Sequence, residues 1–117
     1  MENHYEKIRQ GIDKGKIDDR QVELLVQKMK QTYKKRSDYR LDLYLPLSLL
    51  ARSYFGNGKF KKAAAVLMEL FELLKDVERT LATVTAINAF NAFKSCEMME
   101  EARECLRKAV LNNCIGD

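Results

Sequence analysis

Few of the residue types that carry out catalysis occur in this chain of 117 residues. The single histidine, His4, stands close to the N-terminus, so we expect a surface residue and not a general base. Two adjacent carboxylate pairs, Asp18-Asp19 and Glu100-Glu101, lie in charged stretches that are typical of helix caps or solvated helix faces. The sequence therefore predicts no enzymatic activity, no cofactor and no metal centre.

The three cysteines, Cys96, Cys105 and Cys114, are spaced nine residues apart. On one helix this spacing turns the chain by about 180° and advances it by about 14 Å, so neighbouring thiols would face opposite ways. Neither a local disulfide nor a shared metal ion is then within reach. Because unpaired thiols are typical of a reducing compartment and residues 1–19 lack an apolar signal core, we expect a soluble, cytoplasmic protein.

The glycine-rich sequence Gly56-Asn57-Gly58-Lys59 has only a superficial likeness to a phosphate-binding loop. Such a loop needs another glycine five residues before its Gly-Lys pair and a serine or threonine directly after it. Those two positions hold Ser53 and Phe60 in this chain, which excludes a nucleotide site and favours a turn between two helices.

The net charge of +4 lies entirely in residues 1–40, which contain 11 Lys and Arg residues and 7 Asp and Glu residues. Two tyrosines, Tyr33 and Tyr39, are interleaved with the basic side chains at the end of this segment. Cations that contact phosphates, with aromatics that stack on bases, would make a nucleic-acid site of Lys30, Lys34, Lys35, Arg36 and Arg40. The same lysines near a helix C-terminus also complement its dipole, so a solvated helix end is the favoured interpretation.

Apolar periodicity, caps and glycines predict six helices and no strands. An apolar stripe at helical spacing runs through Val22, Leu25, Val26, Met29 and Tyr33. In residues 63–74, ten of twelve residues are apolar, which indicates a helix covered on two sides, and Glu69 and Glu72 keep that stretch from spanning a bilayer. The expected helices cover roughly residues 2–13, 20–36, 43–55, 59–75, 76–94 and 97–112, with Asp18 or Asp19 capping the second.

An internal repeat emerges when the third and fourth expected helices are aligned with the fifth and sixth. The first unit reads Leu50-Ala51, Tyr54, Gly58, Phe60, Ala63, Leu67, Leu70, and the second reads Ala89-Phe90, Phe93, Glu97, Met99, Ala102, Leu106, Ala109. The first unit, LLARSYFGNGKFKKAAAVL, resembles a tetratricopeptide repeat in its order of small, aromatic and glycine residues.

The likeness to the tetratricopeptide family covers residues 44–77 well and 83–116 loosely. The units are 39 residues apart, whereas the family's repeat has about 34. The family's tryptophan is absent from both units, and Lys75 stands at its terminal proline position. A fifth helix that begins early, at Asp76, would absorb the extra residues, and a still more degenerate unit fits residues 1–34, with Gly15 and Ile17 at its turn.

The resemblance implies a single all-α domain, residues 1–117, of stacked antiparallel helical hairpins, with an irregular helical bundle as the alternative. Its parts would be basic helices in residues 1–40, one hairpin in 44–77 and a degenerate second hairpin in 77–116. In this family the first helix of each hairpin lines a concave groove, and asparagines there commonly hold a partner's backbone. The implied groove residues are Ser48, Arg52, Phe55, Asn88 and Asn91, with Lys94 at the rim.

The residues themselves support part of this expectation. Thr85, Asn88, Asn91 and Ser95 fall within about 120° on the fifth expected helix. An asparagine amide both donates and accepts hydrogen bonds, as a peptide bond does, although packing or plain exposure would also account for the stripe.

We therefore expect a non-catalytic protein-protein interaction module, such as a small adaptor, inhibitor or regulator, that binds a peptide or a protein surface. Self-association is a further expectation, because Val110, Leu111 and Ile115 would remain open on the last helix. A nucleic-acid-binding regulator that uses residues 1–40 is the alternative, and no membrane partner is expected.

Overall fold

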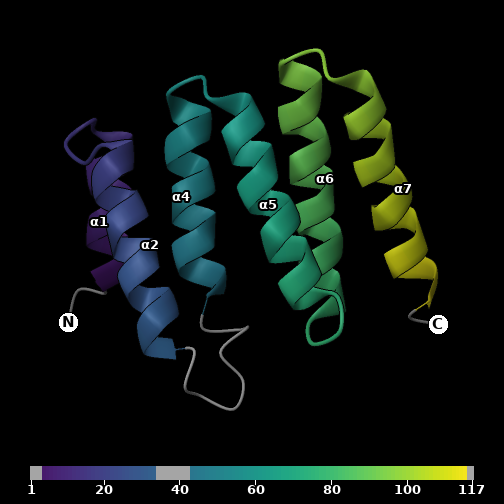
Figure 1. Cartoon of the computed structure of the whole chain (residues 1–117), viewed down its shortest axis with the longest axis horizontal. Helices are drawn as coiled ribbons and strands as arrows, with labels where there is room; N and C mark the ends of the chain where they lie inside the picture. Colours follow the sequence, from purple (N-terminus) through teal and green to yellow (C-terminus); the bar gives the residue numbers. More distant parts are fainter. Residues whose placement is uncertain (1–3, 34–42, 116–117) are drawn as a thin grey trace.

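The computed structural model describes residues 4–33 and 43–115, and these contain six α-helices joined by turns and no strands. Figure 1 shows them side by side, each running opposite to the one before. The helices are α1 (His4–Asp13), α2 (Asp19–Tyr33), α4 (Tyr44–Gly56), α5 (Phe60–Leu74), α6 (Arg79–Ser95) and α7 (Met99–Ile115). The predicted all-α fold is confirmed.

From α2 onward each helix packs against the next one along the chain, whereas α1 packs against α4. Helix α4 packs against α1, α2 and α5, while α6 packs against α5 and α7. The molecule measures 38 × 36 × 24 Å, and its shortest dimension corresponds to about two helix diameters. The row of helices is therefore two layers deep, with α1 lying behind α2 in Figure 1.

Helix α5 is the central wall of the molecule. Its buried side chains share one broad face and are Ala63, Ala64, Leu67, Leu70, Phe71 and Leu74. Alanines on α6, at positions 82, 86, 89 and 92, are fully buried and let that helix lie close to α5. The expectation that the apolar stretch 63–74 is covered on two sides is confirmed, because α4 and α6 both pack on α5.

The three turns that join paired helices share one backbone geometry. Gly15, Gly58 and Glu97 have positive φ angles of 71°, 76° and 61°. The next residue in each turn donates its N–H to a carbonyl five residues earlier, in the bonds Lys16 to Gly11 (2.8 Å), Lys59 to Tyr54 (2.8 Å) and Met98 to Phe93 (2.9 Å). This is the Schellman arrangement at a helix C-terminus, and it recurs at the positions that the repeat alignment placed in the turns.

Asp18 is the N-cap of α2. Its carboxylate accepts the N–H of Gln21 at 3.0 Å, and the Gln21 side chain accepts the N–H of Asp18 at 2.9 Å. This reciprocal pair is a capping box, so the cap predicted at Asp18 or Asp19 falls on Asp18.

Two predicted helix starts were wrong. Helix α6 begins at Arg79 and not at Asp76, since residues 75–78 form a loop in which the N–H of Glu78 bonds the carbonyl of Leu74 at 2.8 Å. With 17 residues against 13 in α4, α6 still absorbs most of the extra length of the second hairpin. Helix α7 begins at Met99 and not at Glu97, because the positive φ of Glu97 belongs to the turn.

Asp19 is neither a cap nor a solvated residue, contrary to the expectation for the Asp18-Asp19 pair. Only 6% of its surface is exposed. Its carboxylate accepts hydrogen bonds from the Ser53 hydroxyl and, at 2.9 Å, from the Asn57 amide, and it lies 2.6 Å from the Lys59 ammonium. Asp19 thereby fastens the start of α2 to the turn between α4 and α5.

Candidate functional site

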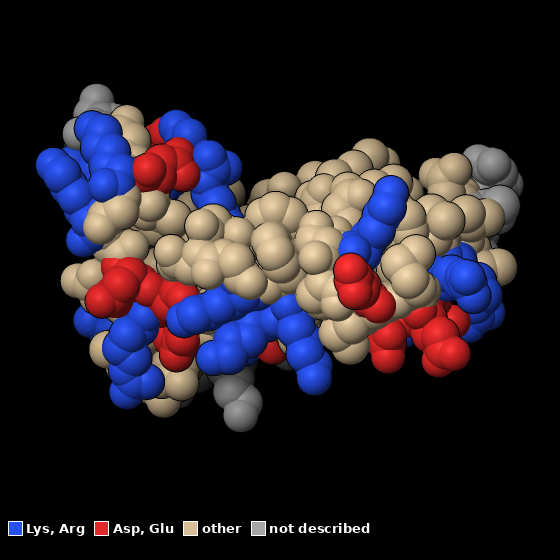
Figure 2. Space-filling view, turned by 90° about the horizontal axis from the view of Figure 1, so that it is seen from above, with Lys and Arg blue, Asp and Glu red and all other residues tan. Residues whose placement is uncertain are grey.

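A groove of about 850 Å³ lies between α4 and α6. Leu67 and Leu70 of α5 form its floor, and Ile12 and Asp13 at the end of α1 close one side. Figure 2, seen from above relative to Figure 1, shows the outline hollowed between the charged N-terminal helices and the uncharged surface beyond them. The volume falls within the range of about 300–1,000 Å³ that is usual for ligand pockets.

Five of the six residues predicted for a groove line this one. Ser48, Arg52 and Phe55 come from α4, and Asn88 and Asn91 come from α6. They meet because the two helices flank α5 and present their exposed faces to the same hollow. No single helix could have brought them together.

Lys94 is a correction, since it is not among the residues that line the groove. Lys94 lies about 120° around the helix from Asn88 and about 180° from Thr85, so its side chain points away from the groove that those two residues line. The Lys94 ammonium lies 5.9 Å from the centre of the Phe90 ring, in the range of a cation–π contact.

The four residues of the polar stripe on α6 differ in whether their side chains are already hydrogen-bonded. The Thr85 hydroxyl donates to the carbonyl of Leu81 at 2.7 Å, and the Ser95 hydroxyl donates to the carbonyl of Asn91 at 2.9 Å. The side chains of Asn88 and Asn91 are exposed and, within the described part of the chain, make no hydrogen bond. Two amides, each able to donate and accept, are therefore open to a ligand in the groove.

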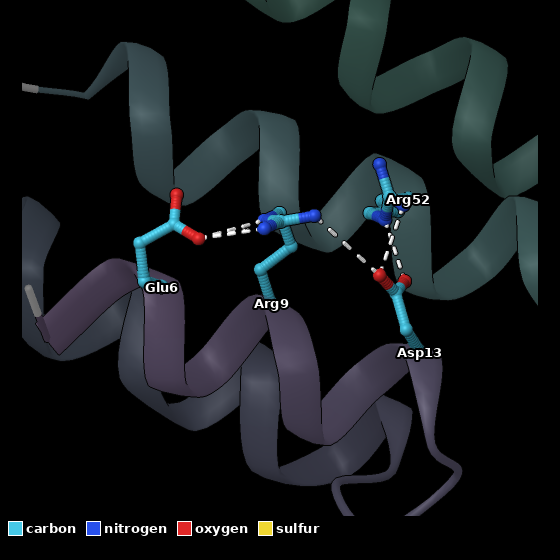
Figure 3. Close-up of polar contacts among 4 residues, drawn as sticks. All are labelled: Glu6, Arg9, Asp13 and Arg52. Atoms are coloured by element: carbon cyan, nitrogen blue, oxygen red, sulfur yellow. Dashed lines mark hydrogen bonds and ion pairs between the residues drawn. The ribbon is translucent and has the colours of Figure 1, made fainter.

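Arg52 is held by a carboxylate from another helix (Figure 3). Its Nε and Nη2 atoms lie 2.7 and 3.0 Å from the two oxygens of Asp13. The hydrogen bond from Arg52 lowers the pKa of Asp13 below its ordinary value, against the opposing effect of burial. Arg9 lies 3.7 Å from the same carboxylate and 2.6 Å from Glu6, so four alternating charges run from α1 to α4.

This ion pair sets the electrostatics of the groove. Asp13 and Arg52 are the charged residues among those that line it, and they neutralise each other. The rest of the lining is apolar or carries uncharged hydroxyls and amides. A ligand that brings an unpaired charge would have to compete with an existing bidentate pair, so the groove favours an uncharged ligand.

Apart from Phe55, the apolar part of the groove was missed in the sequence. Val84 lies one helical turn before Asn88, and its exposed side chain lines the groove beside the buried Leu67 and Leu70. Phe55 is also exposed and meets Phe60 edge to face, with ring centres 4.9 Å apart. The spacing of Val84 from Asn88 was a usable signal, whereas nothing in the sequence indicated that Asp13 would reach Arg52.

Most of the predicted nucleic-acid site lies outside the described residues, namely Lys34, Lys35, Arg36 and Arg40. Lys30 is described, and its ammonium lies 2.7 Å from the Glu69 carboxylate on α5. Its charge is therefore engaged within the chain, and the basic site stays a prediction.

The described cysteines lie apart from the groove. Cys105 is buried, its sulfur lies 3.4 Å from that of Met68, and burial raises the pKa of its thiol. Cys96 donates to the carbonyl of Phe93 at 3.4 Å. In residues 4–33 and 43–115, no group of three or more His, Cys, Asp or Glu side chains could hold a metal ion.

No helix of the described segments has the length and apolar character needed to cross a membrane.

Comparison with known proteins gives no functional assignment, so any proposal about function rests on the groove. No protein-family model, no curated protein and no solved structure matches this chain.

Proposed function

We propose that this chain is a non-catalytic protein-interaction module that holds an uncharged peptide segment in the groove between α4 and α6. The observation that carries the proposal is the pair of unbonded amides, Asn88 and Asn91, beside an apolar floor. Their side chains would exchange hydrogen bonds with the backbone of the peptide, as one peptide group does with another.

The peptide would also bury an apolar side chain. The exposed side chains of Val84 and Phe55 offer the surface for it, above the buried Leu67 and Leu70 of the floor. Apolar contact supplies most of the affinity in sites of this kind, while a few polar groups fix the orientation of the ligand. A segment of a few residues with at least one large apolar side chain and no charge at its centre fits both requirements.

The proposal extends the resemblance of residues 44–77 to tetratricopeptide repeats, in which the first helix of each hairpin faces the bound segment. The equivalent helices in this chain are α4 and α6, and they carry the residues of the groove. A cytoplasmic adaptor or regulator that works by occupying a segment of a larger protein is the role that we propose.

The test is selection of peptides from a random library on the purified chain, followed by measurement of affinity by fluorescence anisotropy. Replacement of both asparagines, N88L and N91L, should weaken binding about 30-fold, because each lost hydrogen bond contributes about 1 kcal/mol. Q27L and Q31L together change two exposed amide side chains on α2, away from the groove, and are the matched control. If the double variant bound the selected peptides as tightly as the control, the groove assignment would be wrong.

A further inference from the structure

Exposed apolar side chains gather on the last described helix. Nine large apolar side chains are exposed in the described part of the chain, and four of them lie on α7. These are Met99, Leu106, Val110 and Leu111, with exposed fractions of 44%, 43%, 54% and 47%. Figure 1 shows α7 at the end of the row, with α6 on one side and no described helix on the other. Such a concentration of apolar surface is typical of an interface.

Three of these exposed apolar residues, together with Arg103, form a seam with coiled-coil spacing. Met99, Arg103, Leu106 and Val110 are separated by four, three and four residues, which is the alternation of the a and d positions of a heptad. On a helix these four positions fall within about 60° of one another. The buried stripe of α7, at Ala102, Cys105 and Ala109, lies to one side of this seam and is already packed inside the molecule.

The charges on α7 indicate which occupant fits the seam. In its first half Glu100, Glu101 and Glu104 outnumber the single basic residue Arg103, whereas Arg107 and Lys108 lie in its second half. A second α7 in parallel orientation would set glutamates beside glutamates, but an antiparallel one sets each acidic half beside a basic half. Helix α7 is therefore complementary to a reversed copy of itself.

We propose that the chain pairs with a second copy of itself through an antiparallel contact between the two α7 helices. Met99 packs against Val110 of the copy, and Leu106 packs against the aliphatic stem of Arg103 of the copy. A two-fold axis makes both contacts twice, as in other symmetric dimers.

The same register explains two flanking charges. Glu100 and Arg107 both follow a seam residue directly, at 99 and 106, and in an antiparallel pair these flanking positions face each other across the interface. Glu100 has no ion-pair partner among the described residues, while Arg107 lies 2.6 Å from Glu104 of its own helix. In the dimer Glu100 meets Arg107 of the copy, and Arg107 meets Glu100 of the copy.

The dimer leaves the groove untouched, because no residue of α7 lines it. Each dimer would present two grooves, so a partner with two copies of the segment would gain affinity through an effective concentration of the second site. The two proposals can accordingly fail independently.

The experiment is sedimentation equilibrium of the whole chain over a range of concentrations, with helicity checked by circular dichroism. The native chain should dimerise, and L106E should remain a monomer of native helicity because it places a carboxylate in the seam. L24E changes an equally exposed leucine on α2 and should dimerise as the native chain does.

Charge reversal tests the antiparallel register. E100R and R107E should each weaken dimerisation about tenfold, since each replaces two attractive pairs with two repulsive ones. An equimolar mixture of the two variants should regain the native affinity, because the mixed dimer restores both pairs. A native chain that stays monomeric at millimolar concentration, a dimer that survives L106E, or a mixture that associates no better than either variant alone would each overturn the proposal.

Discussion

The carboxylate of Asp19 joins two hairpins that are far apart in sequence. Its partners Ser53, Asn57 and Lys59 all belong to the end of α4 or the turn that follows it. Burial alone would raise the pKa of Asp19, but the hydrogen bonds from Lys59, Ser53 and Asn57 outweigh it and lower the pKa. The charged form of Asp19 is therefore the form that the folded state stabilises.

A lowered pKa makes stability depend on pH. Because the folded-state pKa of Asp19 lies below the unfolded value of about 3.9, its contribution is complete above that value and is lost as the pH falls through the folded-state pKa. D19N should lower the free energy of unfolding at pH 7 by about 1–3 kcal/mol. The native chain should approach the stability of D19N as the solution is acidified below about pH 4.

Urea unfolding at a series of pH values measures this effect, and the neighbouring residue supplies the control. D18N keeps a good N-cap on α2, because asparagine caps as well as aspartate does, so it should change stability little. Equal destabilisation by D18N and D19N would show that the network around Asp19 has no special role.

The three hairpin turns have the same backbone conformation, although the residue with positive φ is a glycine in two of them and a glutamate in the third. Gly15 and Gly58 meet the need for positive φ at little cost, whereas Glu97 adopts the same conformation with a side chain. A non-glycine residue in this region is strained by about 1 kcal/mol or more. Turns α1–α2 and α4–α5 are thus relaxed, and turn α6–α7 stores strain.

Substitutions at Glu97 and at Gly58 should change the free energy of unfolding in opposite directions. E97G should raise the free energy of unfolding by up to about 1 kcal/mol, and G58A should lower it by about the same amount, because alanine is strained at a φ of 76°. Thermal unfolding followed by circular dichroism measures both. G56A is the control, since Gly56 lies in α4 with ordinary φ and a Cβ added there would meet open space, so it should be neutral or slightly stabilising.

Local signals allowed the elements to be predicted from the sequence. Apolar periodicity, the Gly-Asn-Gly stop after α4 and the cap at Asp18 each act within a few residues, so the six helices and their order followed from them. The start of α6 was wrong because Asp76 and Glu78 resembled N-terminal residues, yet no side chain caps this helix. Good capping residues permit a helix start without requiring one.

At the scale of the whole molecule, the groove was only partly predictable. Its polar wall followed from periodicity on α4 and α6 together with the family resemblance. The pairing of Arg52 with Asp13 and of Ser53 with Asp19 joins residues 39 and 34 positions apart. Contacts of such long range depend on how α1 and α2 dock onto α4, which no local pattern in the sequence encodes.

The assembled molecule places its two proposed surfaces on different elements. The groove between α4 and α6 is floored by α5, and the seam of α7 lies at the end of the row. The two helices that line the groove, α4 and α6, belong to different hairpins and both pack on α5. The groove therefore depends on the stacking of the two hairpins and not on one hairpin alone. A bound segment should therefore be sensed by residues of α4 and α6 together.

The most direct test of the account is nuclear magnetic resonance of the isotope-labelled chain titrated with a selected peptide. The account predicts that the side-chain amide signals of Asn88 and Asn91 shift on binding, along with backbone signals near Ser48 and Phe55. It also predicts that the signal of Asn113 on α7 stays in place. Shifts confined to α2 or to α7, with the two groove asparagines unchanged, would contradict the claim that the groove binds the peptide.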